Sequence, residues 1–173
     1  MRFKTRLCAL LCALTLSLFA GCGKEALPIS GGTVDRTDPN APKVIHSKEI
    51  TSFDATFFAA SRQVTEDIKM FHLTVKPDDT GKLIASGDVL PFQWPANEAL
   101  LTALQDVIDR YDLAKKNGVY RVTAGLAPEC QEGGLHVTYA SGETLSFTEN
   151  NDPYAPWAEA FYDAFNAWAE GIE

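Results

Sequence analysis

Residues 67–85, DIKMFHLTVKPDDTGKLIA, decide the fold because they contain two strands and the turn between them. Apolar side chains at Phe71, Leu73 and Val75 alternate with polar ones, which is the period of a half-buried strand. The letters DDTG at 78–81 are a tight-turn signal, and the chain returns after them as a second strand. We therefore expect a β-hairpin here.

A second hairpin is expected at residues 135–147, where apolar residues alternate on both sides of Ser141-Gly142. Weaker patterns predict strands in residues 45–58 and 119–122. An apolar stripe with steps of three and four predicts a helix over residues 96–116. The expected class is α+β: an antiparallel sheet built from hairpins, with two amphipathic helices packed on one face.

The second helix is C-terminal and opens at residues 149–153. Its large side chains recur at steps of four and three residues, as Trp157, Phe161, Phe165 and Trp168. This spacing is typical of a helix that packs on a core. A groove for a peptide or a sugar is the alternative interpretation of the same stripe.

The N-terminus has the three parts of an export signal. A basic segment, residues 1–6, precedes 14 uncharged and mostly apolar residues, 7–20, and small residues follow. A membrane-spanning helix needs about 20 apolar residues, so the run is too short for that alternative. The run ends at Ala20-Gly21-Cys22 and turns polar at once.

Ala20-Gly21-Cys22 resembles the lipobox of bacterial lipoproteins, with Phe19 at the position where Leu is usual. The resemblance implies that cleavage falls between Gly21 and Cys22 and that Cys22 carries the lipid. Two or three acyl chains would then hold the protein stably in the bilayer, since each buried methylene contributes roughly 0.8 kcal/mol. We expect the protein at the cell membrane, lipid-anchored on the extracytoplasmic face.

This division predicts three segments: a signal peptide (1–21), the lipidated Cys with a flexible tether (22–43), and a single α+β domain (44–173). The tether is rich in Gly, Pro and Asp and has no apolar period. The soluble part loosely resembles uncharacterised small lipoprotein domains of anaerobic bacteria, in residues 118–120, 125–128, 139–143 and the aromatic helix. That resemblance implies a class and no chemistry.

Charge and cysteine content restrict the partners and the redox chemistry. The chain carries 15 Lys and Arg against 23 Asp and Glu, and removal of residues 1–21 takes away three basic residues, so its formal charge moves from −8 to −11. Such a charge repels nucleic acid, which we exclude as a partner. With two cysteines in the signal peptide and Cys22 lipidated, only Cys130 remains, so no intramolecular disulfide is expected.

Three residues are candidates for a binding site: Trp94, Cys130 and His136. Cys130 lies in a Gly- and Pro-rich loop six residues before His136, and a thiol with a nearby base can act as a nucleophile. No orienting partner or oxyanion donor is visible, and an inert thiol is the simpler interpretation. Trp94, beside Pro95 and outside the aromatic stripe, is the aromatic residue that we associate with surface recognition.

No metal site and no cofactor are predicted. His46, His72 and His136 share no short spacing of the kind that metal ligands usually have. Residues 149–152 gather oxygen ligands, but they lack the spacing and central Gly of an EF-hand loop. The Asn and Asp residues before Pro153 are better explained as a helix cap.

We favour a binding or interaction module of the cell envelope, whose partner is a protein, a peptide or a glycan. The alternative is a small cell-wall or extracellular hydrolase, because paired carboxylates can be present without a sequence motif. A structural or inhibitory module that acts only by contact is a third hypothesis. No phosphate loop, dinucleotide fingerprint or Gly-x-Ser-x-Gly motif is present, so no catalytic residue is assigned.

Overall fold

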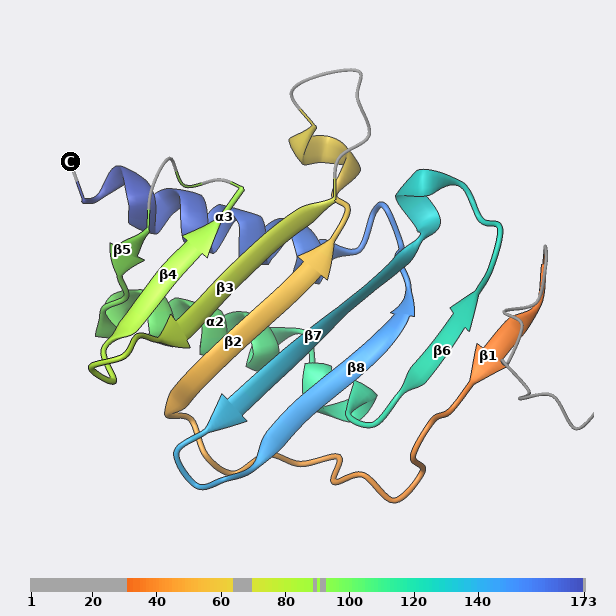
Figure 1. The fold of residues 1–173 in the computed structure, drawn as a ribbon, viewed down its shortest axis with the longest axis horizontal. Coiled ribbons are helices and arrows are strands. Elements are labelled where there is room, and N and C mark those ends of the chain that lie inside the picture. The colour runs from red at the N-terminus through yellow and green to blue at the C-terminus, as the bar shows by residue number, and fades with distance from the viewer. Residues whose placement is uncertain (1–30, 64–69, 89, 91–92, 173) are drawn as a thin grey trace, which may run out of the picture.

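One mixed β-sheet with two α-helices behind it forms the fold in the computed structural model, which describes residues 31–63, 70–88, 90 and 93–172 (Figure 1). The short 3-10 helices are labelled η. In chain order the elements are β1 (Thr33–Asp35), β2 (Ile50–Phe57), η1 (Ala60–Arg62), β3 (Phe71–Pro77), β4 (Leu83–Gly87), β5 (Trp94–Pro95), α2 (Glu98–Arg110), η2 (Leu113–Lys116), β6 (Tyr120–Thr123), η3 (Pro128–Cys130), β7 (Glu132–Tyr139), β8 (Thr144–Asn150) and α3 (Pro156–Glu170).

The hairpin expected in residues 67–85 is confirmed for its described part, residues 70–85, and residues 67–69 lie outside the described residues. β3 and β4 are antiparallel, with Val75 opposite Ala85. Asp78 organises the turn, since its Oδ1 accepts hydrogen bonds from the backbone N–H groups of Thr80 (2.8 Å) and Lys82 (3.0 Å). Gly81 takes the left-handed conformation, at φ 82°, that other residues rarely adopt.

The second hairpin, β7–β8, is also confirmed, with Leu135 opposite Phe147. Across the sheet the strand order is β1-β6-β8-β7-β2-β3-β4-β5. The class is α+β as expected, but the expectation of a purely antiparallel sheet was wrong, because β6 runs parallel to β8. β6 enters the sheet from the helical crossover of α2 and η2 rather than from a hairpin, and this longer connection allows a parallel neighbour.

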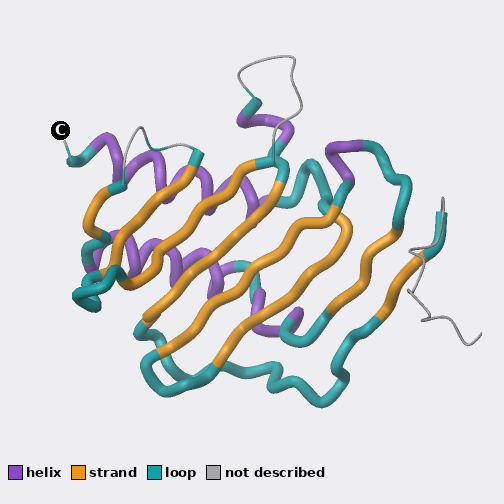
Figure 2. Tube along the Cα trace, in the orientation of Figure 1, coloured by secondary structure: helices purple, strands orange, loops and turns teal. Residues whose placement is uncertain are grey.

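The core lies between the sheet and the helices, which cover the same face (Figure 2). β2 supplies Phe53, Ala55 and Phe57 to it, all fully buried. The Phe53 ring packs edge-on against Phe161 of α3, with 5.1 Å between the ring centroids. The prediction that the aromatic stripe of the last helix is core is confirmed, since α3 buries Trp157, Phe161 and Phe165 and half-buries Trp168.

Both helices are shorter than expected. The N-cap of α2 is Asn97, whose side chain accepts a hydrogen bond from Leu100 N–H (3.1 Å). The helix ends at Arg110, since Asp112 has a φ of 51° and breaks the α-helical path before η2. α3 begins at Pro156 rather than at residues 149–153, because Glu149 and Asn150 pair with β7 as the end of β8.

The residues before α3 do not cap it, so the prediction of an Asn or Asp cap was wrong. The N-cap is Ala155, and no side chain caps it. Asn151 is instead buried and joins three segments: its side chain bonds both main-chain groups of Phe58 (3.0 and 3.1 Å) and donates to Glu129 O (2.9 Å). This amide fastens the end of β2 to the η3 loop.

Residues 31–43, placed by the sequence analysis in the flexible tether, lie against the sheet. β1 pairs with β6, and the buried amide of Asn117 donates to Pro42 O (2.9 Å) and Thr144 O (3.0 Å). The Lys43 ammonium also donates to Asn117 O. Gly and Pro here mark turns of an ordered segment, and the rest of the predicted tether, residues 22–30, lies outside the described residues.

We predict that Phe53→Ala lowers the free energy of unfolding by about 3–5 kcal/mol, because it removes a fully buried ring from the contact between sheet and α3. Urea unfolding followed by circular dichroism measures the change. Leu126→Ala, at an exposed loop position, is the control and should change the free energy by less than about 0.5 kcal/mol. Equal losses in the two variants would contradict the assigned core.

Candidate functional site

The face of the sheet away from the helices is open and polar. Side chains alternate along each strand, so the residues between the buried ones of β2, β3, β7 and β8 project to this face. The strand registers place hydroxyl groups across all of it, from Ser52, Thr56, Thr74, Ser86, Thr138, Thr144, Ser146 and Thr148. We call this surface the open face.

A charged cluster lies on the open face at the centre of β2. The carboxylate of Asp54 accepts a hydrogen bond from Lys76 Nζ (2.6 Å), and its other oxygen lies 3.1 Å from His72 Nε2. Burial raises the pKa of Asp54, but the hydrogen bonds from Lys76 and His72 outweigh burial and leave the pKa below its ordinary value. Asp54 is therefore a fixed, ionised acceptor.

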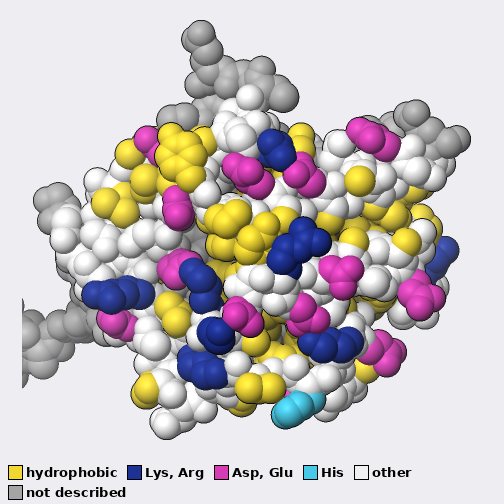
Figure 3. Space-filling model, turned by 180° about the vertical axis from the view of Figure 1, so that it is seen from behind, with side chains coloured by type: hydrophobic (Ala, Val, Ile, Leu, Met, Phe, Trp, Pro, Cys, Tyr) yellow, Lys and Arg dark blue, Asp and Glu magenta, His cyan; other side chains and the backbone are white. Residues whose placement is uncertain are grey.

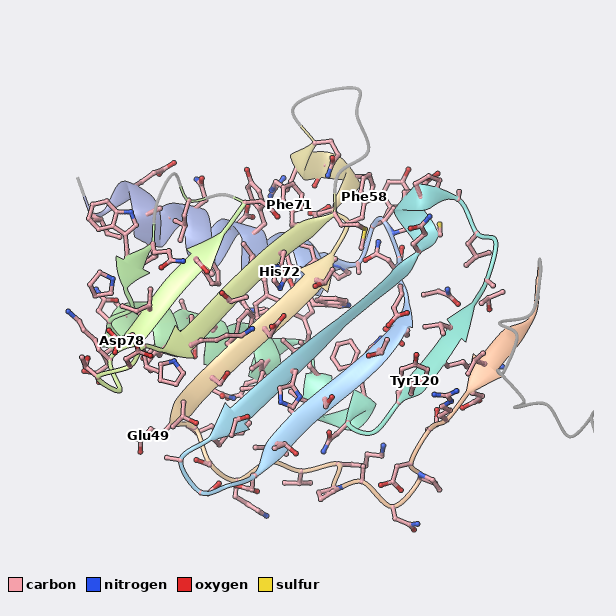
Figure 4. The ribbon with its side chains drawn as sticks, viewed as in Figure 1. Glu49, Phe58, Phe71, His72, Asp78 and Tyr120 are labelled. Atoms are coloured by element: carbon pink, nitrogen blue, oxygen red, sulfur yellow. The ribbon has the colours of Figure 1, made fainter. Side chains whose placement is uncertain are left out.

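His136 is the one sequence-predicted binding residue that joins this cluster. It lies on β7 directly opposite Asp54 of β2 and Ser146 of β8, and its side chain is exposed. Figure 4 shows how His72 on β3 and Tyr120 on β6 lie on strands at either side of these central ones. His72 on β3 and His136 on β7 therefore place one imidazole on each side of Asp54 on the open face.

A first hollow, of about 320 Å³, lies beside this cluster over β2, β7 and β8. Its lining includes Asp54, Thr56, Glu132, Gly134, His136, Ser146 and Thr148. Gly134 has no side chain to fill the space above it. The strand also needs glycine here, because a Cβ at this position would lie 2.3 Å from Phe147 O of the neighbouring β8. Close strand packing and an unfilled surface therefore have the same cause.

A second hollow, of about 430 Å³, continues over β6 and β1. Glu132 lines both hollows, and Thr148 in the first is paired with Tyr120 in the second. The guanidinium of Arg36 lies 5.9 Å from the centroid of the Tyr120 ring, within the range of a cation–π contact. Together the two hollows form a groove that crosses the strands, which we call the open-face groove.

Cys130 and Trp94 are not brought to the groove's centre. Cys130 is the last residue of η3, two residues before Glu132 at the start of β7. The extended strand separates Glu132 from His136 by about 13 Å, so Cys130 and His136 are held apart. Trp94 lies in β5 at the far edge of the sheet and is 37% exposed. The structure therefore gives the Cys130–His136 pair no shared site. Gly21 and Cys22 lie outside the described residues.

The two potential metal sites weighed in the sequence do not form clusters. His72 and His136 share the open face, whereas His46 lies in the segment before β2 and donates its backbone N–H to Glu143 (3.0 Å). Of residues 149–152, Glu149 pairs with Lys116 and Asn151 is buried in the hydrogen bonds described above. Within the described ranges no three His, Cys, Asp or Glu side chains gather to hold a metal ion.

Two further hollows lie on the helix side of the sheet. One, of about 370 Å³, lies between α2 and α3, on the side where Figure 3 shows apolar side chains among acidic and basic ones. Another, of about 430 Å³, lies between α2 and the start of β2. There the Asp109 carboxylate is already engaged, by Lys48 Nζ (2.6 Å) and Gln105 Nε2 (3.0 Å).

No protein-family model, curated protein or solved structure matches this chain. In the part of the chain that the structure describes, no helix has the length and apolar character needed to cross a membrane.

Sequence reasoning missed Asp54, Lys76, Gly134 and Tyr120. Asp54 carried a signal, since it is the only charged residue inside the mixed polar and apolar run of β2. Tyr120 carried none, because its importance comes from the parallel pairing of β6 with β8, which joins segments far apart in the chain. Gly134 lies in the hairpin that the sequence predicted, but the close approach of Phe147 O to it is visible only in the structure.

We predict that Asp54→Asn destabilises the protein at pH 7 and that the difference from the natural chain shrinks in acid. A carboxyl whose pKa is lowered by folding stabilises the fold above its unfolded pKa, about 3.9, and this contribution is lost as pH falls through the folded pKa. Urea unfolding at pH 7 and near pH 3 measures the difference. Asp79→Asn in the β3–β4 turn controls for the lost charge, and a pH-independent difference for Asp54→Asn would contradict the assigned ion pairs.

Proposed function

We propose that this protein is a lipid-anchored extracytoplasmic binding module whose open face holds a ligand of the cell envelope. The observation that carries the proposal is the open-face groove: two adjoining hollows on the uncovered face of a sheet whose other face packs against the helices. Polar side chains dominate the lining of the first hollow, and the second is lined by polar side chains together with apolar ones such as Val34, Val122 and Leu126. Each hollow reaches the lower end of the 300–1,000 Å³ range usual for ligand sites.

The proposed anchor rests on the lipobox-like residues Ala20-Gly21-Cys22. The fold limits how far the folded domain can lie from Cys22. Residue 31 is already tied to the sheet, since Gly31 N–H donates to Ala124 O (3.2 Å). The nine peptide steps from Cys22 to Gly31 can reach at most about 30 Å. A domain on so short a connection samples only ligands near the membrane surface, which supports an envelope partner.

Binding is better supported than hydrolysis, the alternative function. The general acid of a hydrolase needs a carboxyl whose pKa is raised, whereas the hydrogen bonds to Asp54 lower its pKa. The two carboxylates of the first hollow, Asp54 and Glu132, start from well-separated backbone positions. Asp54 of β2 lies opposite His136 of β7, and Glu132 lies four residues before His136 on that strand. The thiol of Cys130 lies outside that hollow.

Action by apolar contact alone has less support as well. The large exposed apolar residues of the described chain come from four separate segments: Val44, Trp94, Leu126 and Tyr154. Single exposed apolar residues are ordinary at protein surfaces, and a contact surface needs a contiguous patch of several hundred Å². The open-face groove is therefore the surface that we assign to the partner.

We predict that a photo-reactive benzoylphenylalanine at Thr148 forms a covalent adduct in intact cells, and that the same group at Thr102 does not. Thr148 lines the open-face groove, whereas Thr102 is an exposed threonine of α2 on the helix side. Irradiation followed by mass analysis of the membrane fraction measures the adducts. Adducts from Thr102 alone, or from neither position, would contradict the proposed ligand face.

The same experiment in a Cys22→Ser background tests the anchor. The natural chain should be found in the membrane fraction, with an intact mass that begins at Cys22 and includes two or three acyl chains. The variant should lose that lipid mass and leave the membrane fraction. A natural chain that carries no lipid would overturn the anchor while leaving the Thr148 result to judge the ligand face.

A further inference from the structure

We propose that the ligand of the open-face groove is a neutral linear glycan that lies across the strands and contacts several sugar rings at once. This inference rests on the proposed function, since it names the ligand class of the same groove. It follows from three features of the groove: its length, the kind of groups it presents, and the pairing of its charges.

The length suits a chain of sugars rather than one small molecule. The cross-strand row Thr56, Gly134, Thr148 and Tyr120 runs through both hollows, from β2 to β6. Three strand spacings of about 4.8 Å make this row roughly 14 Å long, and Arg36 beyond β6 extends it further. A single compact ligand would fill one hollow, whereas an extended one can lie in both.

The groups of the first hollow match a polyhydroxyl ligand. The central strands β2, β7 and β8 have a neighbour on each side, so their backbone groups serve the sheet and the ligand meets side chains. Hydroxyls such as Thr56, Ser146 and Thr148 both donate and accept hydrogen bonds, and the carboxylates of Asp54 and Glu132 accept them. Sugar hydroxyls are donors and acceptors in the same way, so each can be satisfied on this surface.

The charge at the centre of the first hollow is compensated, which favours a neutral ligand. Lys76 and His72 compensate Asp54 at one end, and the Arg36 guanidinium lies over the Tyr120 ring at the other. The chain as a whole has a formal charge of −8, so a polyanionic glycan would be repelled. A polycation would find the Asp54 carboxylate already engaged by Lys76 and His72.

A peptide or protein partner fits this surface less well. Peptides that bind to sheets add a strand at an edge, and the edge strands here, β1 and β5, are only three and two residues long. Protein partners need a cluster of buried apolar anchors at the centre of the interface. The centre of the groove instead carries Gly134 between threonines, and its aromatic ring, Tyr120, lies toward one end.

Tyr120 gives the groove a surface on which a sugar ring can pack. Its side chain is half-buried, so the ring is held in place, and it lines the second hollow with Val34 and Val122. An aromatic ring with a polar hydroxyl can contact the apolar face of a sugar while it hydrogen-bonds the edge. We therefore assign Tyr120 to ring packing and Thr148, its neighbour on β8, to hydrogen bonding.

The test is calorimetric titration of the full mature chain in detergent with tetrasaccharides of β-1,4-linked glucose and of β-1,4-linked N-acetylglucosamine, and with the two monosaccharides. We expect at least one tetrasaccharide to bind, and its monosaccharide to bind at least about tenfold more weakly because it fills one part of the groove. Tyr120→Ala and Thr148→Ala should each weaken the tetrasaccharide about tenfold, and Thr102→Ala on α2 should leave it unchanged.

Unfolding curves of each variant separate loss of binding from loss of fold, and Thr148→Ala, at a half-buried surface hydroxyl, provides a second test if Tyr120→Ala unfolds. Binding that is unchanged in both folded variants would overturn the assigned groove. Another outcome is that neither tetrasaccharide binds at millimolar concentration while the Thr148 adduct still forms in cells and its mass identifies a protein. That result would overturn the glycan as the ligand class and leave the proposed binding function standing. Failure of both the sugars and the adduct would overturn the proposed function as well.

Discussion

The packing of β2 against α3 is the interaction on which the rest of the structure depends. Phe53 lies within 5.1 Å of Phe161 and 6.1 Å of Phe165, measured between ring centroids, and these rings seal one face of the central strand. Because side chains alternate along a strand, sealing Phe53 and Phe57 forces Asp54 and Thr56 to the other face. The polar open face is therefore a geometric consequence of the core.

Local patterns were enough to predict the two hairpins and the aromatic helix. The turn at Asp78 and the four-residue spacing from Trp157 to Phe165 are short-range signals, and the structure contains both features. The parallel pairing of β6 with β8 was not predictable in this way, because it depends on where a helical crossover returns to the sheet. Likewise, β1 lies in a Gly- and Pro-rich segment and gains its strand conformation only from pairing with β6.

The candidate site shows the same division. Residue type alone drew attention to Trp94, Cys130 and His136, which the structure places at a sheet edge, in a loop and on the open face. What makes His136 part of a site is its position opposite Asp54, which no local pattern encodes. The first hollow also needs β2, whose pairing with β7 is long-range, and so the hollow could be found only once the fold was known.

We propose that the open face is occupied in the cell envelope, and histidine labelling tests this proposal most directly. Diethyl pyrocarbonate modifies exposed imidazoles, and both His136 on the open face and His46 outside it are exposed in the structure. The account predicts that the purified protein is modified at both residues, and that in intact envelopes His136 is protected while His46 is not. Equal modification of His136 in the two samples would contradict an occupied open face.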